Sequence, residues 1–336
     1  MKKDKILLDH GSGGRASHDL IRNIFFPHFE NPILEQMDDS AVLTIGHERL
    51  AFSTDSYVVD PIFFPGGSIG NLAVNGTVND LAMSGAEPLF ISIGLIIEEG
   101  FPLEDLEKIL LHMQQAATEA AVQVVTGDTK VVHRKAADKI FINTSGIGRI
   151  PNGVSLSGKN AAPGDRILLS GTAADHGITI LTQREGLRMD TSLKSDTAPL
   201  NHMVRKMLES SRNIHTLRDP TRGGIATSLN EIAVQAGVGI RLYESAVPVR
   251  NETRGACELL GLDPLYIANE GKLLAFVAAA DAETMLRAVR TMPYGQDAQI
   301  IGEAVSAHPG KVVMETAIGG TRVLDMLTGE QLPRIC

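Results

Sequence analysis

The segment IGNLAVNGTVNDLAMSG, residues 69–85, decides the fold of the first half of the chain. It predicts a helix from Ile69 to Ser84, and Gly85 supplies the stop signal that commonly follows a helix. Nearer the N-terminus, residues 6–8 predict a short strand, and the apolar positions within 20–25 predict a helix. Further strands are predicted at residues 41–45, 50–52, 89–97, 122–125 and 139–147, and a further helix at residues 103–120. Alternating strands and helices indicate an α/β domain.

A region rich in turn residues separates this half from the second. The motifs PNG, SGKN and APGD between Pro151 and Gly164 predict loops, so we expect domains at 1–155 and 156–330 and a flexible tail at 331–336. Strands are predicted at residues 166–170, 238–242, 273–278, 299–301, 312–315 and 322–324, and helices at 177–187, 200–210, 224–235 and 282–291. The sequence therefore predicts two halves of similar size, each α/β or α+β.

Composition limits the class of partner. The 336 residues carry a net charge of −9, and their Lys and Arg form no cluster, so a nucleic-acid partner is not expected. Residues 6–8 are too short an apolar run for a signal peptide, and no stretch reaches the roughly 18 apolar residues of a membrane span. Cys257 and Cys336 alone suggest neither a disulfide framework nor a zinc site. We expect a cytoplasmic protein without a membrane or nucleic-acid partner.

Acidic residues stand at or near the ends of predicted elements in the first half, namely Asp39, Asp55, Asp80 and Asp128. Carboxylates at neighbouring strand ends can converge, and hard oxygen ligands suit a Mg²⁺ ion that carries nucleotide phosphates. Each of them alone is equally well explained as a cap of a turn or helix. Four together favour a Mg²⁺–nucleotide site, while the adjacent Asp38 leaves the register of the first acid open.

Two motifs carry groups suited to phosphate. Lys130 follows Asp128 by two residues, which places a cation on the same face of an extended segment, where it could neutralise phosphate charge. The motif HGSGGR, residues 10–15, offers the amides of Gly13 and Gly14 ahead of a predicted helix. It lacks the lysine and the spacing of a P-loop, so a plain glycine turn explains it equally well.

Three features of the second half suggest groups around a substrate. DPTRGG, residues 219–224, precedes a predicted helix and could hold substrate or form the floor of a cleft. Glu270 in ANEGKL is a candidate general base, with a turn-capping role as the alternative. The last residue, Cys336, puts a thiol where a chain is freest to move, which suits a carrier that visits two active sites.

These motifs carry a family resemblance. DDSAV, STDSY, NGTVNDLAMSGAEP and TGDTK together resemble the aminoimidazole ribonucleotide synthetase superfamily of ATP-dependent enzymes. Within that superfamily, HGSGG, FSTDSYVVDPIFFPGG, DPTRGG, ANEGK and the terminal PRIC are similar to a family of nickel-iron hydrogenase maturation factors. The resemblance runs nearly from end to end.

The resemblance implies a two-domain aminoimidazole ribonucleotide synthetase-like fold, in which the N-terminal domain pairs its β-sheet in a homodimer and ATP binds between the domains. It implies that a partner carbamoyltransferase carbamoylates the terminal thiol. ATP with Mg²⁺ then dehydrates this thiocarboxamide to a thiocyanate, which supplies cyanide to an iron-carrier complex. Carried onto this sequence, the implied metal ligands are Asp39, Asp55, Asp80 and Asp128; the implied nucleotide contacts are Asp55, Asp80, Asp128, Lys130, Gly13, Gly14 and Asn79; and the implied catalytic residues are Cys336 and Lys130, with Glu270 as the base that we add.

Two other hypotheses remain open from the sequence. In the first, the enzyme acts on a free small molecule and Cys336 has no role, so that only a carrier enzyme would acquire a modified terminal cysteine. In the second, the protein is a nucleotide-responsive scaffold, which predicts no ATP turnover by the carbamoylated protein.

Overall fold

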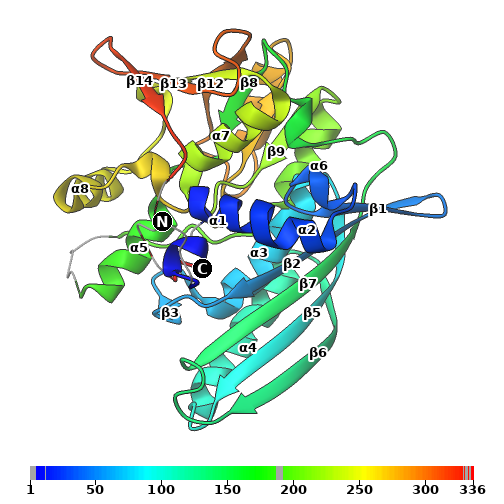
Figure 1. The fold of residues 1–336 in the computed structure, drawn as a ribbon, viewed down its shortest axis with the longest axis vertical. Helices are drawn as coiled ribbons and strands as arrows, with labels where there is room; N and C mark the ends of the chain where they lie inside the picture. Colours follow the sequence, from blue (N-terminus) through cyan, green and yellow to red (C-terminus); the bar gives the residue numbers. More distant parts are fainter. Residues whose placement is uncertain (1–4, 12, 187–191, 328, 330–331, 333) are drawn as a thin grey trace.

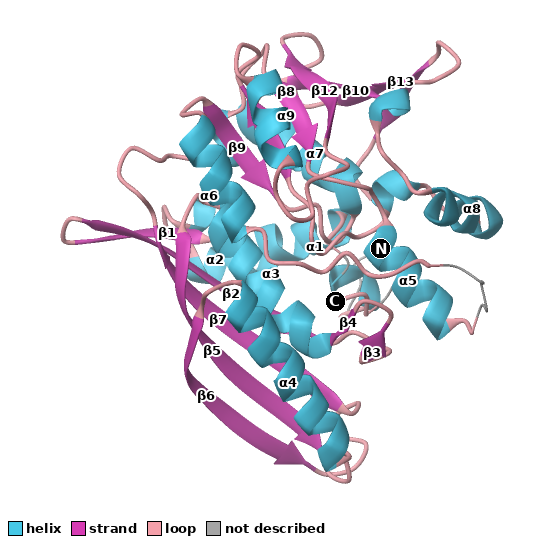
Figure 2. Ribbon diagram, turned by 180° about the vertical axis from the view of Figure 1, so that it is seen from behind, coloured by secondary structure: helices cyan, strands magenta, loops and turns pink. Residues whose placement is uncertain are grey.

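The protein is built on two β-sheets, each flanked by helices (Figure 1). The structure, a computed structural model, describes residues 5–11, 13–186, 192–327, 329, 332 and 334–336. Figures 1 and 2 place both ends of the described chain near the junction of the two sheet-containing units. Within these described residues, no helix is long and apolar enough to cross a membrane.

The first sheet has five strands in the order β1-β2-β7-β5-β6. The β5 and β6 strands run parallel, and the other neighbouring pairs are antiparallel. The strands are β1 (Ala41–Ile45), β2 (Glu48–Tyr57), β5 (Glu87–Glu98), β6 (Gln123–Val132) and β7 (Ile140–Arg149). Helices α3 (Ile69–Met83) and α4 (Leu103–Glu119) cover one face, whereas no helix of the described part of the chain covers the opposite face in Figure 1 or Figure 2.

Helix α3 is the buried centre of this unit, as the opening segment predicts. Ser68 begins it with a capping box, in which its hydroxyl accepts from Gly70 N–H and its own backbone N–H donates to Asn71 Oδ1. A Cβ at Gly76 would lie 2.1 Å from the hydroxyl of Tyr57, so only glycine allows the helix to approach β2 this closely. The apolar helix face joins a core that extends to Ile335 and Cys336.

The second sheet has seven strands in the order β14-β13-β10-β12-β8-β11-β9. Its strands are β8 (Arg166–Leu169), β9 (Ile214–Arg218), β10 (Gly239–Tyr243), β11 (Leu274–Val277), β12 (Gln299–Val305), β13 (Val312–Glu315) and β14 (Thr321–Leu324). The helices of this half are α5 (Asp175–Arg184), α6 (Asn201–Ser210), α7 (Gly224–Ala236), α8 (Asn251–Leu260) and α9 (Ala282–Arg290). Apolar residues of α6, α9 and α3 share one core, which ties the two units together.

Short elements complete the chain. A two-stranded sheet forms from β3 (Phe63–Phe64) and β4 (Gly67–Ser68). The N-terminal segment consists of a 3₁₀ turn (Leu8–Gly11), α1 (Arg15–Leu20), a π-helical turn (Ile21–Phe25) and α2 (Phe26–Phe29). Further 3₁₀ turns lie at Leu34–Gln36, Gly158–Asn160, Glu244–Ala246 and Pro264–Tyr266. The expected domain boundary after residue 155 falls between the end of β7 and the start of β8.

The structure corrects several predicted elements. No strand forms at residues 6–8, because local bonds turn the chain instead: Leu7 N–H donates to His10 Nδ1, and His10 N–H donates to the Leu7 carbonyl. The strand predicted at 122–125 continues to Val132, so Asp128 lies inside it rather than at its end. The strand β9 was not predicted, and the predicted end of α5, Leu187, lies outside the described residues.

Candidate functional site

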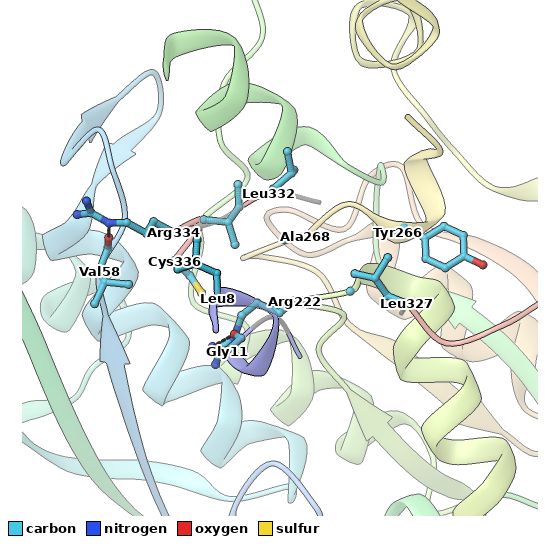
Figure 3. A pocket seen from close by; sticks show the side chains of 12 residues that line it. Leu8, Gly11, Val58, Arg222, Tyr266, Ala268, Leu327, Leu332, Arg334 and Cys336 are labelled. Atoms are coloured by element: carbon cyan, nitrogen blue, oxygen red, sulfur yellow. Dashed lines mark hydrogen bonds between the residues drawn. The ribbon is translucent and has the colours of Figure 1, made fainter. Parts of the chain in front are cut away.

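The last residues of the chain are docked between the two units. Val58 N–H donates to the Cys336 carbonyl at 3.0 Å, and Asp60 N–H donates to the Arg334 carbonyl at 3.3 Å. The Arg334 guanidinium donates from Nε to the Val58 carbonyl at 2.8 Å, a bond drawn in Figure 3. Cys336 is 8% exposed. The expected flexible tail is therefore seen in one docked conformation, and its residues Gln331 and Pro333 lie outside the described part of the chain.

A cavity of about 220 Å³ lies against the docked thiol. Its lining includes Gly11, Arg222, Ala268 and Cys336, which come from four separate parts of the sequence (Figure 3). The Arg222 guanidinium donates to the Gly11 carbonyl at 3.0 Å, so the HGSGGR loop rests on the DPTRGG loop. These two motifs, which the sequence could not place, form one wall beside the terminal cysteine.

The docked thiol is a weak acid. Burial raises the pKa of Cys336 to about 12, with Glu270 and Asp55 raising it further and Arg222 opposing them. The same field acts on the cation, because the Cys336 thiolate is the largest influence raising the pKa of Arg222. Cys336, Arg222, Glu270 and Asp55 therefore share one electrostatic environment.

Glu270 is buried, and its charge acts on the Cys336 thiol. Burial raises its pKa well above the ordinary value, Asp219 and Asp55 add to the shift, and Arg222 opposes it. Among the described residues, its Oε1 atom has no hydrogen-bond partner. Its backbone N–H donates to Asp196 Oδ1 at 3.0 Å, which fixes the start of the ANEGK segment. A buried carboxyl group with an open acceptor atom is suited to taking up a proton.

Three of the four predicted acids, Asp39, Asp55 and Asp80, lie within electrostatic range of one another. Burial is the main cause that raises the pKa of Asp80 well above its ordinary value. The charges of Asp219, Asp55 and Asp39 raise it further, in that order of size. The hydroxyl of Ser53 donates to Asp80 Oδ2 at 2.6 Å. The motif DPTRGG supplies Asp219, whose pKa burial raises to about 6. These mutually repelling carboxylates form an acidic cluster of Asp39, Asp55, Asp80 and Asp219.

The structure separates the roles of the two adjacent acids at positions 38 and 39. Asp39 pairs with Arg218 at 2.7 Å and faces the acidic cluster. Asp38 instead accepts a bond from Gly158 N–H at 3.0 Å and so caps a turn. Asp39 is thus the acid of this pair that faces the cluster.

The acidic cluster suits a cation but does not by itself form a closed metal site. Within the described residues, no three His, Cys, Asp or Glu side chains lie close enough to hold one ion. A divalent cation with phosphate oxygens would relieve the repulsion that raises the pKa of Asp80. The donor set therefore agrees with a metal that arrives together with nucleotide phosphates rather than with a permanently bound ion.

Asp128 and Lys130 do not join this cluster within one chain. They form an exposed ion pair at 2.8 Å, and the ammonium of Lys130 lowers the pKa of Asp128. In the register of the first sheet, Asp128 lies opposite Gly94, on the face turned away from α3 and α4. Asp55 lies on β2 in line with Ser53 and Tyr57, which are buried toward those helices. The two predicted groups therefore occupy opposite faces.

The remaining predicted contacts have structural partners. The Asn79 amide donates to the Ala198 carbonyl at 3.0 Å, and its oxygen accepts from Leu200 N–H at 2.8 Å. Gly13 N–H donates to Ser17 Oγ at 2.9 Å, and a Cβ at Gly14 would lie 2.4 Å from the Leu327 carbonyl. These residues brace the walls of the site, and their predicted nucleotide contacts stay predictions.

Sequence reasoning missed two charged members of the site, Arg222 and Asp219. Both lie in DPTRGG, whose charge pair was expected to hold substrate or to form the floor of a cleft, but neither residue was given an individual role. The signal was present in the motif, but nothing local indicated that it would face the C-terminus.

Comparisons with known proteins agree along the whole chain. Residues 37–150 match the AIR synthase related protein, N-terminal domain family, and residues 162–315 match its C-terminal domain family. The carbamoyl dehydratase HypE of Cupriavidus necator is 51% identical, covering 100% of this chain and 96% of that protein.

Two solved structures are similar in both sequence and fold. A crystal structure of the hydrogenase maturation protein HypE in complex with ATP has 54% identity and a TM-score of 0.84, covering 99% of this chain and 100% of that one. A HypE-HypF complex has 47% identity and a TM-score of 0.88, covering 92% and 99%.

Proposed function

This chain belongs to the AIR synthase related proteins and, within them, to the carbamoyl dehydratase HypE family, and from that premise we propose that it uses ATP to dehydrate a carbamoyl group carried on Cys336. The product is a thiocyanate that supplies cyanide during nickel-iron hydrogenase maturation. The observation that carries the proposal is the burial of the terminal thiol beside Arg222 and Glu270, next to the acidic cluster.

The chemistry requires phosphorylation before elimination. A thiocarboxamide does not readily lose oxide from carbon, so its oxygen first takes the γ-phosphoryl group of ATP, with ADP as the leaving group, and one N–H proton passes to solvent. The carbon–oxygen bond then breaks with phosphate as the leaving group. Glu270 accepts the second N–H proton as the carbon–nitrogen triple bond forms. A buried site favours this order, since water would compete for the activated intermediate.

Charged residues of this chain would hold the nucleotide. Asp55, Asp80 and Asp219 would bind Mg²⁺ together with phosphate oxygens rather than as a ready-made three-carboxylate site, and Mg²⁺ when present neutralises phosphate charge. Arg222 faces the sulfur and would stabilise negative charge on the phosphorylated oxygen. Asp39 is already paired with Arg218, so it would act through its charge rather than as a metal ligand.

Charging requires the tail to leave this site. The docked thiol, with its pKa raised to about 12, is protonated at neutral pH and buried, and both properties suppress nucleophilic attack. We therefore assign carbamoylation to an undocked tail presented to HypF, a partner found with a relative in the HypE-HypF complex. The HypC-HypD complex is the proposed acceptor of cyanide. ATP and a reduced thiol are both available in the cytoplasm, where we place the reaction.

Mass spectrometry of the intact protein tests the proposal directly. Incubation with HypF, carbamoyl phosphate and ATP is expected to add a carbamoyl group to Cys336 and then to remove one water from it. Omitting Mg²⁺ is expected to stop the protein at the carbamoylated state. A carbamoylated Cys336 that never loses water in the presence of Mg²⁺ and ATP would contradict the proposed function.

The Asp80→Asn variant is expected to weaken Mg²⁺–ATP binding by roughly 10- to 100-fold, because it removes a charge from a site of low effective dielectric. The fold should not suffer: Asn keeps an acceptor for Ser53 and removes a carboxylate that its neighbours disfavour. Isothermal titration calorimetry and the melting temperature without ligand measure the two effects. Unchanged affinity would remove Asp80 from the site.

A homodimer is expected to form through the first sheet. The apolar strand β5 lies inside this sheet, between β7 and β6. The uncovered face nevertheless exposes Phe90, Ile96 and Ile147, at 43%, 45% and 39%. Sedimentation at micromolar concentration should show a dimer, and Phe90→Lys should give a monomer. Leu103→Lys, on the opposite side at 75% exposure, is the matched control. A wild-type monomer would contradict the pairing.

Pairing through this face would also give Asp128 and Lys130 a role in the site of the partner protomer. Asp80→Asn and Asp128→Asn proteins should each bind Mg²⁺–ATP weakly. After the two are mixed and allowed to exchange subunits, half the dimers would be mixed, each with one intact site, so about a quarter of the sites should recover. Absence of recovery despite subunit exchange would leave Asp128 without a part in a shared site.

A further inference from the structure

A buried histidine holds the residue next to the carrier cysteine. His176 on α5 is 0% exposed, and its Nε2 atom lies 2.7 Å from the carbonyl oxygen of Ile335. Its Nδ1 atom lies 2.8 Å from Ser195 Oγ. Both views place α5 close to the C-terminus (Figures 1 and 2).

The partners of the ring determine its protonation. A carbonyl can only accept, so the Nε2 atom of His176 must carry a proton and donate it to Ile335. In the neutral ring, Nδ1 then accepts from the Ser195 hydroxyl, whose oxygen in turn accepts from Thr197 N–H at 3.1 Å. Each donor in this series of three hydrogen bonds therefore has an acceptor. Burial lowers the pKa of His176, which favours this neutral form.

The same segment also fixes the proposed base. Ser195 supports His176, and the neighbouring Asp196 accepts the N–H of Glu270 at 3.0 Å. A Cβ at Gly271 would lie 1.8 Å from the Asp196 carbonyl, so the ANEGK segment packs closely against residues 195–197. Residues 195–197 thus contact both His176, which holds the C-terminal tail, and Glu270.

We propose that His176 is a positioning residue for dehydration, which holds the Ile335 carbonyl and thereby seats the carbamoylated Cys336 beside Glu270. This role rests on the proposed function and adds a division of labour to it. His176 serves the step that occurs in the docked state and has no part in charging by HypF, because charging requires the tail to leave.

Two substitutions separate this role from simple packing. His176→Gln can place an amide N–H near the Nε2 position and keep the donor to Ile335. His176→Asn is shorter, reaching only the Nδ1 position toward Ser195. Both remove the edge-on ring contact with Phe64, at 5.7 Å between centroids, so the loss of that contact is common to the pair. The difference between them isolates the bond to the tail.

The first measurement is the alkylation rate of Cys336 by iodoacetamide in a Cys257→Ser background, without nucleotide. Loss of one buried hydrogen bond should raise the rate by about tenfold in His176→Asn, with His176→Gln close to wild type. The dehydration rate of carbamoylated protein should fall similarly in His176→Asn only, while carbamoyl acceptance is unchanged. An alkylation rate in His176→Asn equal to that of the wild type would overturn the proposal. So would a dehydration rate that falls equally in His176→Asn and His176→Gln.

A measurement on the unsubstituted ring keeps the test decisive where both variants misfold. Nitrogen-15 spectra of the imidazole should show a proton on Nε2 of His176, and deletion of Ile335 and Cys336 should alter that signal. A proton on Nδ1 instead, or a signal unaffected by the deletion, would refute the assignment. Alkylation and spectra need no turnover, so they stand apart from a failure of the proposed dehydration.

Discussion

Cys336→Ala is expected to abolish both carbamoyl acceptance and thiocyanate formation while Mg²⁺–ATP binding stays near wild type. The reason is chemical: no other atom of the tail can carry the group. The effect on stability should be small, because the residue lies at a chain end and the substitution removes only a sulfur atom from the core around α3. Intact-protein mass spectrometry and ATP titration measure the two expectations.

The second cysteine provides the matched control. Cys257 on α8 is 2% exposed, and burial raises its pKa to about 11, so it is an unreactive core residue. Cys257→Ser should therefore be carbamoylated and dehydrated like the wild type. A modified sulfur that maps to Cys257, or a thiocyanate formed by protein lacking Cys336, would end the carrier hypothesis.

The parts of the fold that depend on local pattern were predictable. The helix expected at 69–84 is α3, since its apolar positions, the preceding Ser68 and the following Gly85 all act within a few residues. Asp80 was placed correctly on it for the same reason. The gathering of Asp39, Asp55 and Asp80 was also foreseen, because element ends in an α/β unit tend to meet.

Strand pairing and side-chain facing were not predictable. Residues 126–132 carry few core-type side chains, so nothing local indicated that β6 would continue through Asp128. Which face Lys130 occupies depends on the parallel register of β6 on β5, a pairing set by distant residues. The convergence of Arg222, His176 and Cys336 depends in the same way on how three separate segments pack at the junction of the units.

Glu270→Gln is expected to slow dehydration by about 100- to 10,000-fold, the usual cost of losing a positioned general base. Carbamoyl acceptance should continue, because charging occurs away from this cavity. Burial raises the pKa of Glu270, so its basic form appears only at a pH above the ordinary glutamate range. The single-turnover rate of the wild type should therefore rise as the pH increases above the ordinary glutamate range, and this rise should disappear in Glu270→Gln.

The surface residue Glu87 offers a control of identical chemistry. Its side chain is 53% exposed and pairs with Arg149 at 3.2 Å, so Glu87→Gln removes the same charge away from the cavity and should leave the dehydration rate unchanged. Rapid quenching followed by mass spectrometry gives the ratio of carbamoylated to cyanated Cys336 at each pH. If Glu270→Gln retains the rate and the pH dependence of the wild type, a different group must accept the proton. The open Oε1 atom of Glu270, buried among the described residues and near the sulfur, is the reason to expect the opposite.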